Sequence, residues 1–550
     1  MQFLRVFDDI CDKAIRFTMV RSGLSFILLT LLTMGLFYSN ITMLPQFDRG
    51  EAEFVLQIQS FFTKQNLFNF ENKNYIGLLG YWLHIPFIAL FGDHGADNVA
   101  AYRIISLIGG IALIISTFLL GRRIFGREAG LIAAILTVIP LIFQHEIIFS
   151  GTTTLLSAII TINFYAQACL WRRDMMGRDT AFSNRHFFTF WLSLIFAVLI
   201  SAVSLFFIII PMIGLSIVKN DIEWLTPLQI HFGAIISAII ILPPLLVISH
   251  LSDLSLLQIF LGAESLSTLI DTSLYTKNWP LKYLAGHIIW GWPIILLSPI
   301  ALFYSFKNRS DDRFTFGIYS LFLLWSVAEI APVKILWFGL ILTVFVSVII
   351  AGTFIKFIND DYHMPKGIFL ISITIYMFLS LCIAVKIPYM SYFLTGNIDP
   401  ILVICAVLSL GISILNVMML SQNFMHGIAA GLLLQIAVLF GYFNNVTSHN
   451  FDVLDTPNRL EKAIARTGCP TSALYISGYH HPSLSFKFGK NITMLSADEM
   501  NARYKNATPC SIFIVGKNHK DFVASGNSSE LITVFDIKNY QTIMLEIYKR

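Results

Sequence analysis

The sequence predicts a multi-pass α-helical membrane protein that ends in a small α/β domain. Hydrophobic residues make up 56% of the 550 residues and charged residues only 13%, whereas a soluble globular protein carries about 25% charged residues. Long apolar runs fill residues 1–445, and residues 446–550 alternate short β-rich and helical segments. The net charge of +4 is too small to indicate a nucleic-acid partner.

Apolar runs of about 18 or more residues predict membrane-spanning helices. Residues 187–218 form one apolar run that is too long for a single ordinary span and that contains Pro211, so we predict two short spans there. Together with this pair, the runs give about 13 transmembrane helices; the others lie at 23–43, 104–121, 129–145, 152–171, 231–249, 287–306, 314–331, 335–356, 367–385, 400–420 and 424–443.

The basic residues predict the orientation of this bundle. Lysines and arginines are concentrated in the N-terminal segment and in every second loop between the predicted spans. Short loops rich in these residues face the cytoplasm. The N-terminus is therefore expected in the cytoplasm, and the loops 44–100 and 251–285 and the C-terminal tail on the other side. The basic residues are Arg5, Lys13, Arg16, Arg21, Arg122, Arg123, Arg127, Arg172, Arg173, Arg178, Arg185, Lys307, Arg309, Arg313, Lys356 and Lys366.

The sequence of the tail predicts a small α/β domain. Short β-rich runs predict strands, and Ser496 is placed to cap a helix over residues 497–505. Cys469 and Cys510 each precede a predicted strand, and a tail outside the cytoplasm would allow them to form a disulfide. The predicted strands are 473–477, 492–495, 511–515, 532–536 and 542–548, and a second helix is expected at 457–467.

An acidic cluster follows the first predicted span. It contains Asp48 and Glu51, whose i, i+3 spacing places them on one face if the segment is helical. Carboxylates at a membrane boundary are costly and often line functional cavities, and a carboxylate is also a suitable general base. The alternative is a solvated loop start or a salt bridge to Arg49, and Glu53 is expected to be solvated.

Six parts of the chain resemble, in order, motifs of the bacterial ArnT-like glycosyltransferases, which are related to the protein O-mannosyltransferases. The resemblance covers nearly the whole chain. The parts are 48–54 (DRDEARF in the family), 80–83 (GIYWLQ), 101–106 (YRLPS), 264–265 with 287–293 (the large outer loop), 332–334 (PTKLPHY) and 478–484 (GYxEPSL).

The resemblance implies a GT-C fold in a bacterial inner membrane, with the tail in the periplasm. It also implies transfer of a sugar from a polyprenyl-phosphate carrier to a lipid, glycan or protein acceptor, by an inverting reaction. On this reading Asp48 is the base and Glu51 orients the acceptor or a metal. The carrier phosphate is held by Arg103, His287 and Lys334, and Tyr81 and Trp82 contact the sugar.

Several positions depart from the family pattern. Gly50 stands where the family has the second Asp of its first motif, and Glu53 stands in place of an Arg. The lysine-bearing KKP segment aligns with residues 75–77, the AKTD segment with residues 150–154, and the Asp and Lys of the outer loop with Thr268 and Thr272. Lys334 is kept, but Trp337 replaces a His. These changes remove polar groups from a cavity that has to hold an anion.

Other interpretations of the site remain open. Arg103 is a candidate anchor for the second span, His287 an interfacial residue beside Trp290, and Tyr81 and Trp82 interfacial anchors. A catalytically inactive relative that binds a lipid, a glycan or a partner enzyme is an alternative to an active transferase. A secondary transporter ranks lower, because no paired Gly/Pro-interrupted segments are seen in two halves. We assign no metal site. A divalent metal would have to be bound by Asp48 together with Glu51 or Glu53. The sequence does not indicate the oligomeric state.

Overall fold

The computed structural model describes most of the helical bundle and the core of the tail. Asp48 and Lys334 lie outside the described residues, as do Cys469, Cys510 and most of the predicted first span. The described residues are 4–10, scattered positions between 13 and 37, 49–63, 78–91, 99–171, 180–252, 255–256, 281–330, 336–359, 365–395, 397–422, 424, 427–435, 437–438, 456–468, 474–477, 482–488, 492–507, 511–516, 530–536 and 541–549.

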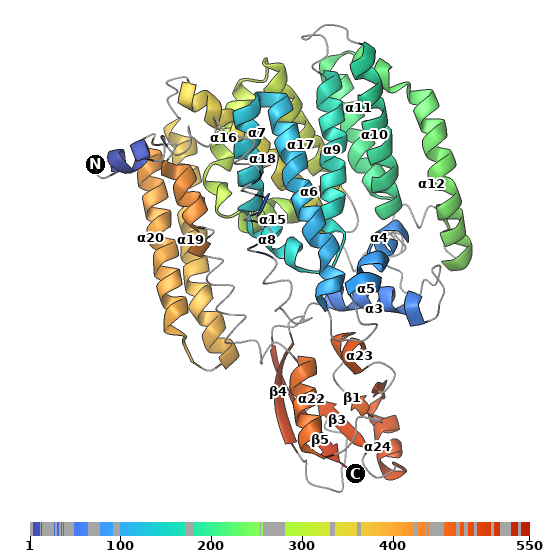
Figure 1. Ribbon diagram of the computed structural model, residues 1–550. Coiled ribbons are helices and arrows are strands. Elements are labelled where there is room, and N and C mark those ends of the chain that lie inside the picture. Colours follow the sequence, from blue (N-terminus) through green and yellow to red (C-terminus); the bar gives the residue numbers. More distant parts are fainter. Residues whose placement is uncertain are drawn as a thin grey trace.

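The chain is a multi-pass α-helical membrane protein with a small sheet domain at its C-terminal end (Figure 1). Seven described helices are long and apolar enough to cross a membrane. Five of them have the bounds α6 (Val99–Phe125), α9 (Thr153–Trp171), α12 (Ile230–Ser252), α17 (Asp312–Ile330) and α18 (Leu336–Asn359), and two lie at one side of the bundle, α19 (Lys366–Thr395) and α20 (Pro400–Ser421).

The long apolar run at 187–218 forms two helices, as predicted. Helix α10 (Thr180–Ile200) and helix α11 (Ser204–Lys219) are separated by a short turn. Pro211 lies inside α11 and does not cause the break. Because α10 and α11 pack against each other, the chain reverses direction there.

Two runs predicted as single spans are broken, and those predictions were wrong in this respect. The run at 129–145 bends by 68° between α7 (Arg127–Val138) and α8 (Leu141–Ile148). Pro140 lies at the bend; it lacks an N–H and cannot continue the ladder of helical hydrogen bonds. The run at 287–306 is divided into α15 (Lys282–Trp290), a short 3₁₀ turn η4 (Ile294–Leu296) and α16 (Ser298–Lys307), with Gly291 and Pro293 at the break.

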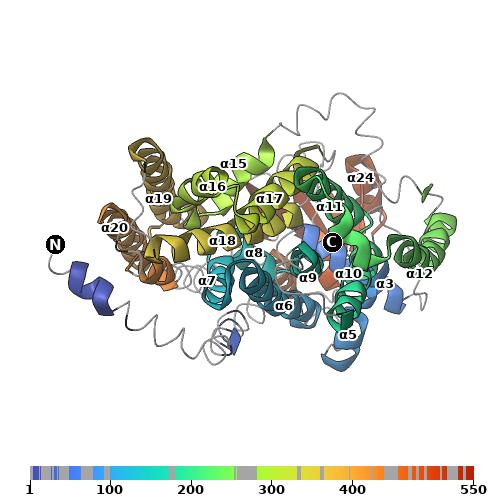
Figure 2. The same cartoon turned by 90° about the horizontal axis from the view of Figure 1, so that it is seen from above.

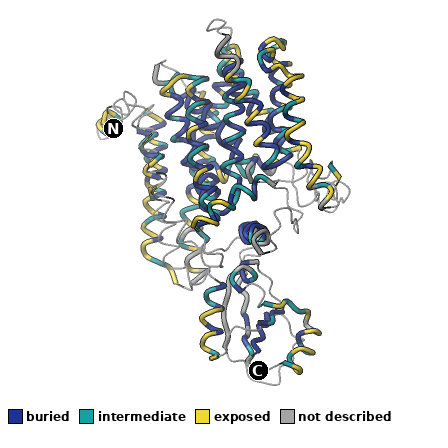
Figure 3. The backbone as a smooth tube through the Cα atoms, turned by 45° about the vertical axis from the view of Figure 1, so that its right-hand side comes forward, coloured by how far each residue is buried: buried dark blue, intermediate teal, exposed yellow. Residues whose placement is uncertain are grey.

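Burial separates inner from peripheral helices. In the spanning part of α18, 89% of the residues are buried inside the protein, whereas the corresponding share is 22% in α12 and α19. Figure 3 shows the same contrast along the backbone, with dark inner helices and yellow outer faces. Viewed from above, α18 lies among α7, α16 and α17, and α12 stands at the edge (Figure 2). The peripheral helices therefore supply most of the lipid-facing surface.

The tail forms a five-stranded mixed sheet with the order β2-β1-β3-β5-β4. Strand β1 pairs in parallel with β2 and β3, and β5 pairs antiparallel with β3 and β4. All five predicted strands are confirmed, with the bounds β1 (Leu474–Ser477), β2 (Ile492–Met494), β3 (Ile512–Gly516), β4 (Glu530–Asp536) and β5 (Gln541–Lys549).

Both predicted tail helices are also confirmed. Helix α22 (Thr456–Arg466) buries Leu460 and Ile464 in the core of the domain. Helix α24 (Ala497–Lys505) begins with a capping box, in which Ser496 and Glu499 hydrogen-bond to each other's backbone N–H groups. These hydrogen bonds satisfy amides at the first turn and explain why the helix begins there.

A further tail helix was not predicted. Helix α23 (Pro482–Phe488) falls within the segment 478–484 that resembles a family motif. It packs against α3 (Arg49–Thr63), the helix that carries the acidic cluster. Figure 1 shows α23 between the sheet and α3, so the tail meets the bundle at this helix. We call this end of the bundle the tail end, and the end that carries Arg122, Lys307 and Arg313 the basic end.

Candidate functional site

Three segments that lie far apart in the sequence meet at a buried ion pair at the tail end. Nε of Arg103 donates to Oε1 of Glu51 at 2.7 Å, and Nη2 of Arg103 donates to Oε2 at 2.7 Å. The backbone N–H and the hydroxyl of Ser150 also donate to Oε1 of Glu51, at 2.7 and 2.9 Å. Glu51 lies in the DRDEARF-like segment, Arg103 in the YRLPS-like segment and Ser150 in the AKTD-like segment.

Local packing places these three residues. Helix α3 buries Ala52, Val55 and Ile58 on one face, and the first turns of α6 bury Ala101 and Tyr102. Residues from these two helix faces pack together in one hydrophobic cluster. The turn after α8 is tied to α6, because the hydroxyl of Ser106 donates to the Gly151 carbonyl at 3.0 Å and that of Thr154 donates to the Ser106 carbonyl at 2.8 Å.

Glu51 is enclosed by this arrangement. Its exposed fraction is 2% and that of Arg103 is 0%, and four hydrogen bonds occupy its carboxylate. A buried pair of this kind is held by good geometry and by hydrogen bonds to the remaining lone pairs. The geometry suits a residue that positions α3 against α6 and the α8–α9 turn, and it leaves little room for Glu51 to contact an acceptor or to bind a metal.

The predicted sugar-contacting residues lie beside α3. Tyr81 is 1% exposed and its ring stacks on that of Phe54, with the centroids 5.1 Å apart. Trp82 is partly exposed. His84 is fully buried, lies edge-on to Phe54 and donates from Nδ1 to the Gly80 carbonyl at 2.9 Å. Tyr81 therefore supports α3 in this arrangement, and of the pair Trp82 is the more accessible to a ligand.

Two of the three predicted phosphate contacts lie on different helices, and Lys334 lies outside the described residues. Arg103 is engaged by Glu51, and His287 lies on α15, where its ring centroid is 6.0 Å from that of Trp325 on α17. The helix α15 is held there by Glu329, whose Oε1 accepts the backbone N–H of Tyr283 at 3.0 Å and the indole N–H of Trp325 at 3.2 Å.

A second acid–base pair was missed by sequence reasoning. Nδ1 of His145 lies 2.8 Å from Oε1 of Glu146, on the bent helix α8. Glu146 is 9% exposed, whereas His145 is 32% exposed. A carboxylate that holds one nitrogen of an imidazole orients the other nitrogen as a proton acceptor. The available signal was the polar triplet 144–146, which follows Pro140 at the end of a predicted span.

Aromatic contacts connect this pair to the buried ion pair. The guanidinium carbon of Arg103 lies 5.9 Å from the ring centroid of Phe149, and that ring lies 4.6 Å from the ring of His145. On its other side His145 meets the ring of Trp290 at 5.8 Å. These contacts connect α6, α8 and α15, so one aromatic ring, that of Phe149, separates His145 from the Arg103 guanidinium.

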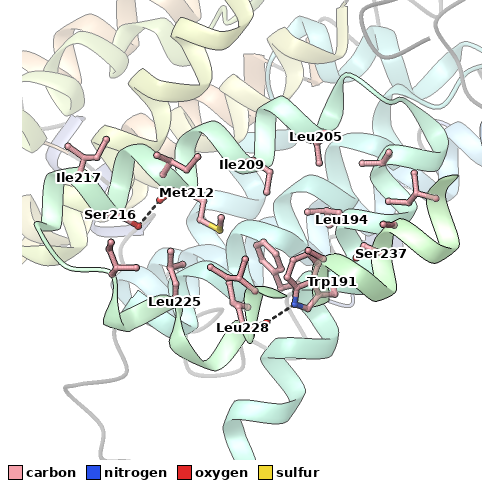
Figure 4. Close-up of a pocket in the computed structure, with 18 of the residues that line it drawn as sticks. Trp191, Leu194, Leu205, Ile209, Met212, Ser216, Ile217, Leu225, Leu228 and Ser237 are labelled. Atoms are coloured by element: carbon pink, nitrogen blue, oxygen red, sulfur yellow. Dashed lines mark hydrogen bonds between the residues drawn. The ribbon is translucent and has the colours of Figure 1, made fainter. Parts of the chain in front are cut away.

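A large apolar groove lies elsewhere, between α10, α11 and α12. Its volume is about 1090 Å³, and it is lined mainly by aliphatic side chains such as Leu194, Ile209 and Leu225 (Figure 4). The indole of Trp191 closes one side by donating to the Leu228 carbonyl at 2.9 Å. None of the predicted site residues lines this groove. Over the described ranges, no group of three or more His, Cys, Asp or Glu side chains is arranged to hold a metal ion.

Comparison with known proteins shows the fold. The chain is similar to the crystal structure of ArnT from Cupriavidus metallidurans bound to undecaprenyl phosphate, with a TM-score of 0.68 and 13% identity over 95% of this chain and 97% of that one. The apo form of that ArnT gives a TM-score of 0.65 and 13% identity over 96% and 98%. The archaeal oligosaccharyltransferase AglB from Archaeoglobus fulgidus gives 0.48, with 11% identity over 90% and 69%.

No protein-family model and no curated protein sequence matches the chain. The chain has the GT-C fold of ArnT along nearly its whole length, as the resemblance of its motifs predicted.

Proposed function

We propose that this chain is a membrane glycosyltransferase that moves a sugar from a polyprenyl-phosphate carrier to a lipid, glycan or protein acceptor at the outer face of the bacterial inner membrane. One observation carries the proposal. Glu51, Arg103 and Ser150, from three segments that resemble or align with motifs of the family, meet at one buried point in a fold shared with an ArnT that was crystallised with undecaprenyl phosphate. Fold alone does not determine chemistry, so the residues around this point have to supply it.

The reaction needs a base. A group must accept the proton of the acceptor hydroxyl while its oxygen attacks the anomeric carbon, and the bond from that carbon to the carrier phosphate breaks. The electron pair of this bond leaves with polyprenyl phosphate. Because a single displacement occurs on the face opposite the leaving group, the anomeric configuration is inverted. Lys334 and His287 are proposed to contact the leaving phosphate, and Trp82 the sugar.

Two residues compete for the role of base. Asp48 is the first candidate, because in the sequence it directly precedes α3, which begins at Arg49 and holds Glu51 in its first turn. His145 is the alternative, because Glu146 holds its Nδ1 and the imidazole is partly exposed. The enclosed Glu51 and Arg103 act as positioning residues in either case.

The test is sugar transfer by purified protein in lipid nanodiscs, with polyprenyl-phosphate sugars labelled in the sugar. Asp48→Asn and His145→Gln are compared with Asp498→Asn, which removes an exposed carboxylate from the tail. A base contributes about 10²–10⁴-fold to rate. Loss of that size in one variant only, with Asp498→Asn active, assigns the base.

A binding protein without catalysis is the second candidate. It is favoured by the full engagement of Glu51 and Arg103 with each other, which leaves neither charge free for a donor. Retention of polyprenyl phosphate without release of sugar from any donor would support this candidate and refute the transferase. Absence of both binding and transfer would refute both.

A further inference from the structure

We propose that a cavity at the basic end, between α6, α9 and α17, binds the phosphate of an anionic phospholipid. The cavity has a volume of about 500 Å³. Arg122 and Arg123 reach it from the last turn of α6, Arg313 from the first turn of α17, and Tyr165 from α9. Leu119, Phe125 and Gly126 complete the lining. The proposal is independent of the proposed transferase activity.

The charged residues that line the cavity are all basic. Three arginines line one cavity, and none of the described residues in its lining is an Asp or a Glu. Arg122 forms no ion pair with a described carboxylate. Arg313 has Asp311 beside it, but Nε and Oδ1 are 3.9 Å apart, and that carboxylate also accepts the backbone N–H of Arg313 at 3.0 Å. Like charges gathered in this way repel one another unless an anion lies between them.

One of the three arginines, Arg123, is also held in place. Nη2 of Arg123 donates to the Cys169 carbonyl near the end of α9 at 3.0 Å. The ring of Phe125 lies 4.9 Å from that of Phe314, which keeps the end of α6 against the beginning of α17. Guanidinium groups present planar pairs of donors that match a phosphate, and Tyr165 adds a hydroxyl. Fixed donors lose less entropy when they bind than mobile ones do.

The location favours a lipid over a soluble ligand. The cavity lies where three helices that include spanning segments reach the basic end of the bundle. Its lining combines the arginines with Leu119 and Phe125, so a headgroup and the glycerol region of one lipid meet a polar and an apolar surface together. Basic pockets between spanning helices on the cytoplasmic side are suited to anionic headgroups. A free phosphate would use only the arginines and the Tyr165 hydroxyl, and not the apolar part of the lining.

The experiment measures lipid binding by native mass spectrometry of the full chain, released from detergent with added phosphatidylglycerol or phosphatidylcholine. The variant Arg122→Gln/Arg313→Gln removes two charges from the cavity and leaves Arg123 on its carbonyl. The control Lys307→Gln/Arg309→Gln removes two charges from the same end, at residues that do not line the cavity. Thermal melting of each variant tests whether it is folded.

We expect phosphatidylglycerol to bind the cavity variant about 30-fold more weakly than the wild type or the control, from a contribution of about fivefold per arginine near an anionic lipid. Equal weakening in the control would overturn the proposal in favour of a general basic surface. Equal binding of phosphatidylcholine would overturn the need for an anionic headgroup. Full displacement of the lipid by millimolar inorganic phosphate would indicate a site for free phosphate and would overturn the lipid assignment.

If the cavity variant does not fold, Arg122→Gln alone decides the question. Arg122 is exposed and has no ion pair among the described residues, so its loss should leave the fold intact. A weakening of about fivefold for phosphatidylglycerol supports the site, and no change refutes it.

Discussion

Glu51 and Arg103 are 52 positions apart in the sequence and form a two-point ion pair in which both contacts measure 2.7 Å. Both side chains are withdrawn from solvent. The pair joins the helix that carries the acidic cluster to the first turns of a spanning helix. The pair therefore fixes the position of α3 relative to α6 at the tail end of the bundle.

Removal of one partner should destabilise the protein strongly. Glu51→Gln leaves the Arg103 guanidinium buried without its counter-charge, and such a change costs about 3–5 kcal/mol. Arg103→Gln should cost a similar amount, and the double variant less than the sum of the two because the orphan charge is gone. The measurement is the free energy of unfolding in mixed micelles, with the exposed Glu223→Gln as a control. Additive losses would contradict a direct pair.

Gly109 permits the close approach of α6 and α9. A Cβ at this position would lie 2.4 Å from the backbone N of Leu155 and 2.5 Å from Oγ1 of Thr154. Gly109→Ala should therefore destabilise the protein by about 1–3 kcal/mol through overpacking. Gly411→Ala in α20 is the matched control, since nothing lies within 4 Å of its Cβ, and it should be neutral or slightly stabilising because Ala is the better helix former. Equal melting temperatures for the two variants would contradict the packing.

His84 should make the segment between α3 and α6 sensitive to acid. Burial lowers the pKa of His84 from 6.5 to about 4, so the unfolded chain takes up a proton at a higher pH than the folded protein does. The stability from neutral His84 is therefore fully present above pH 6.5 and is lost as the pH falls toward 4, by at most about 3 kcal/mol.

The variant His84→Asn tests this effect. It cannot titrate and keeps a donor for the Gly80 carbonyl, so its stability should depend less on pH between 6.5 and 4 than that of the wild type. His231→Asn, at an exposed position, should keep the full dependence. The measurement is melting temperature against pH, and parallel curves for wild type and His84→Asn would refute the assignment.

A polar network in the bundle should contribute modestly to stability. Oε1 of Gln435 accepts the Tyr376 hydroxyl at 2.7 Å, and its Nε2 donates to the Ser413 hydroxyl at 2.6 Å. Hydrogen bonds between membrane helices contribute about 0.6 kcal/mol each on average and at most about 1.7 kcal/mol. Gln435→Leu should thus cost about 1–2 kcal/mol of unfolding free energy, measured against Gln422→Leu at an exposed position. A cost above that range would mean that the network also determines how the helices are arranged.

The type of most elements followed from local properties of the sequence. Apolar length predicted most of the spanning helices, because each span needs its own run of side chains that tolerate lipid. Alternation and turn residues predicted the five strands, and Ser496 marked the beginning of α24. These signals lie within a few residues of one another and do not depend on the rest of the fold.

The sequence by itself thus determined a multi-pass bundle, a tail with five strands and two of its helices, and an ordered set of segments that resemble one family. Only the tertiary structure decided that Glu51 is enclosed by Arg103 and Ser150, that α8 turns through 68° and presents His145 with Glu146, and that α23 packs on α3. The physical reason is that apolar length and β-propensity are summed over neighbouring residues. An ion pair or a helix contact between distant segments depends instead on how whole helices pack. The pattern of residues along the chain does not give the distance in space between such segments.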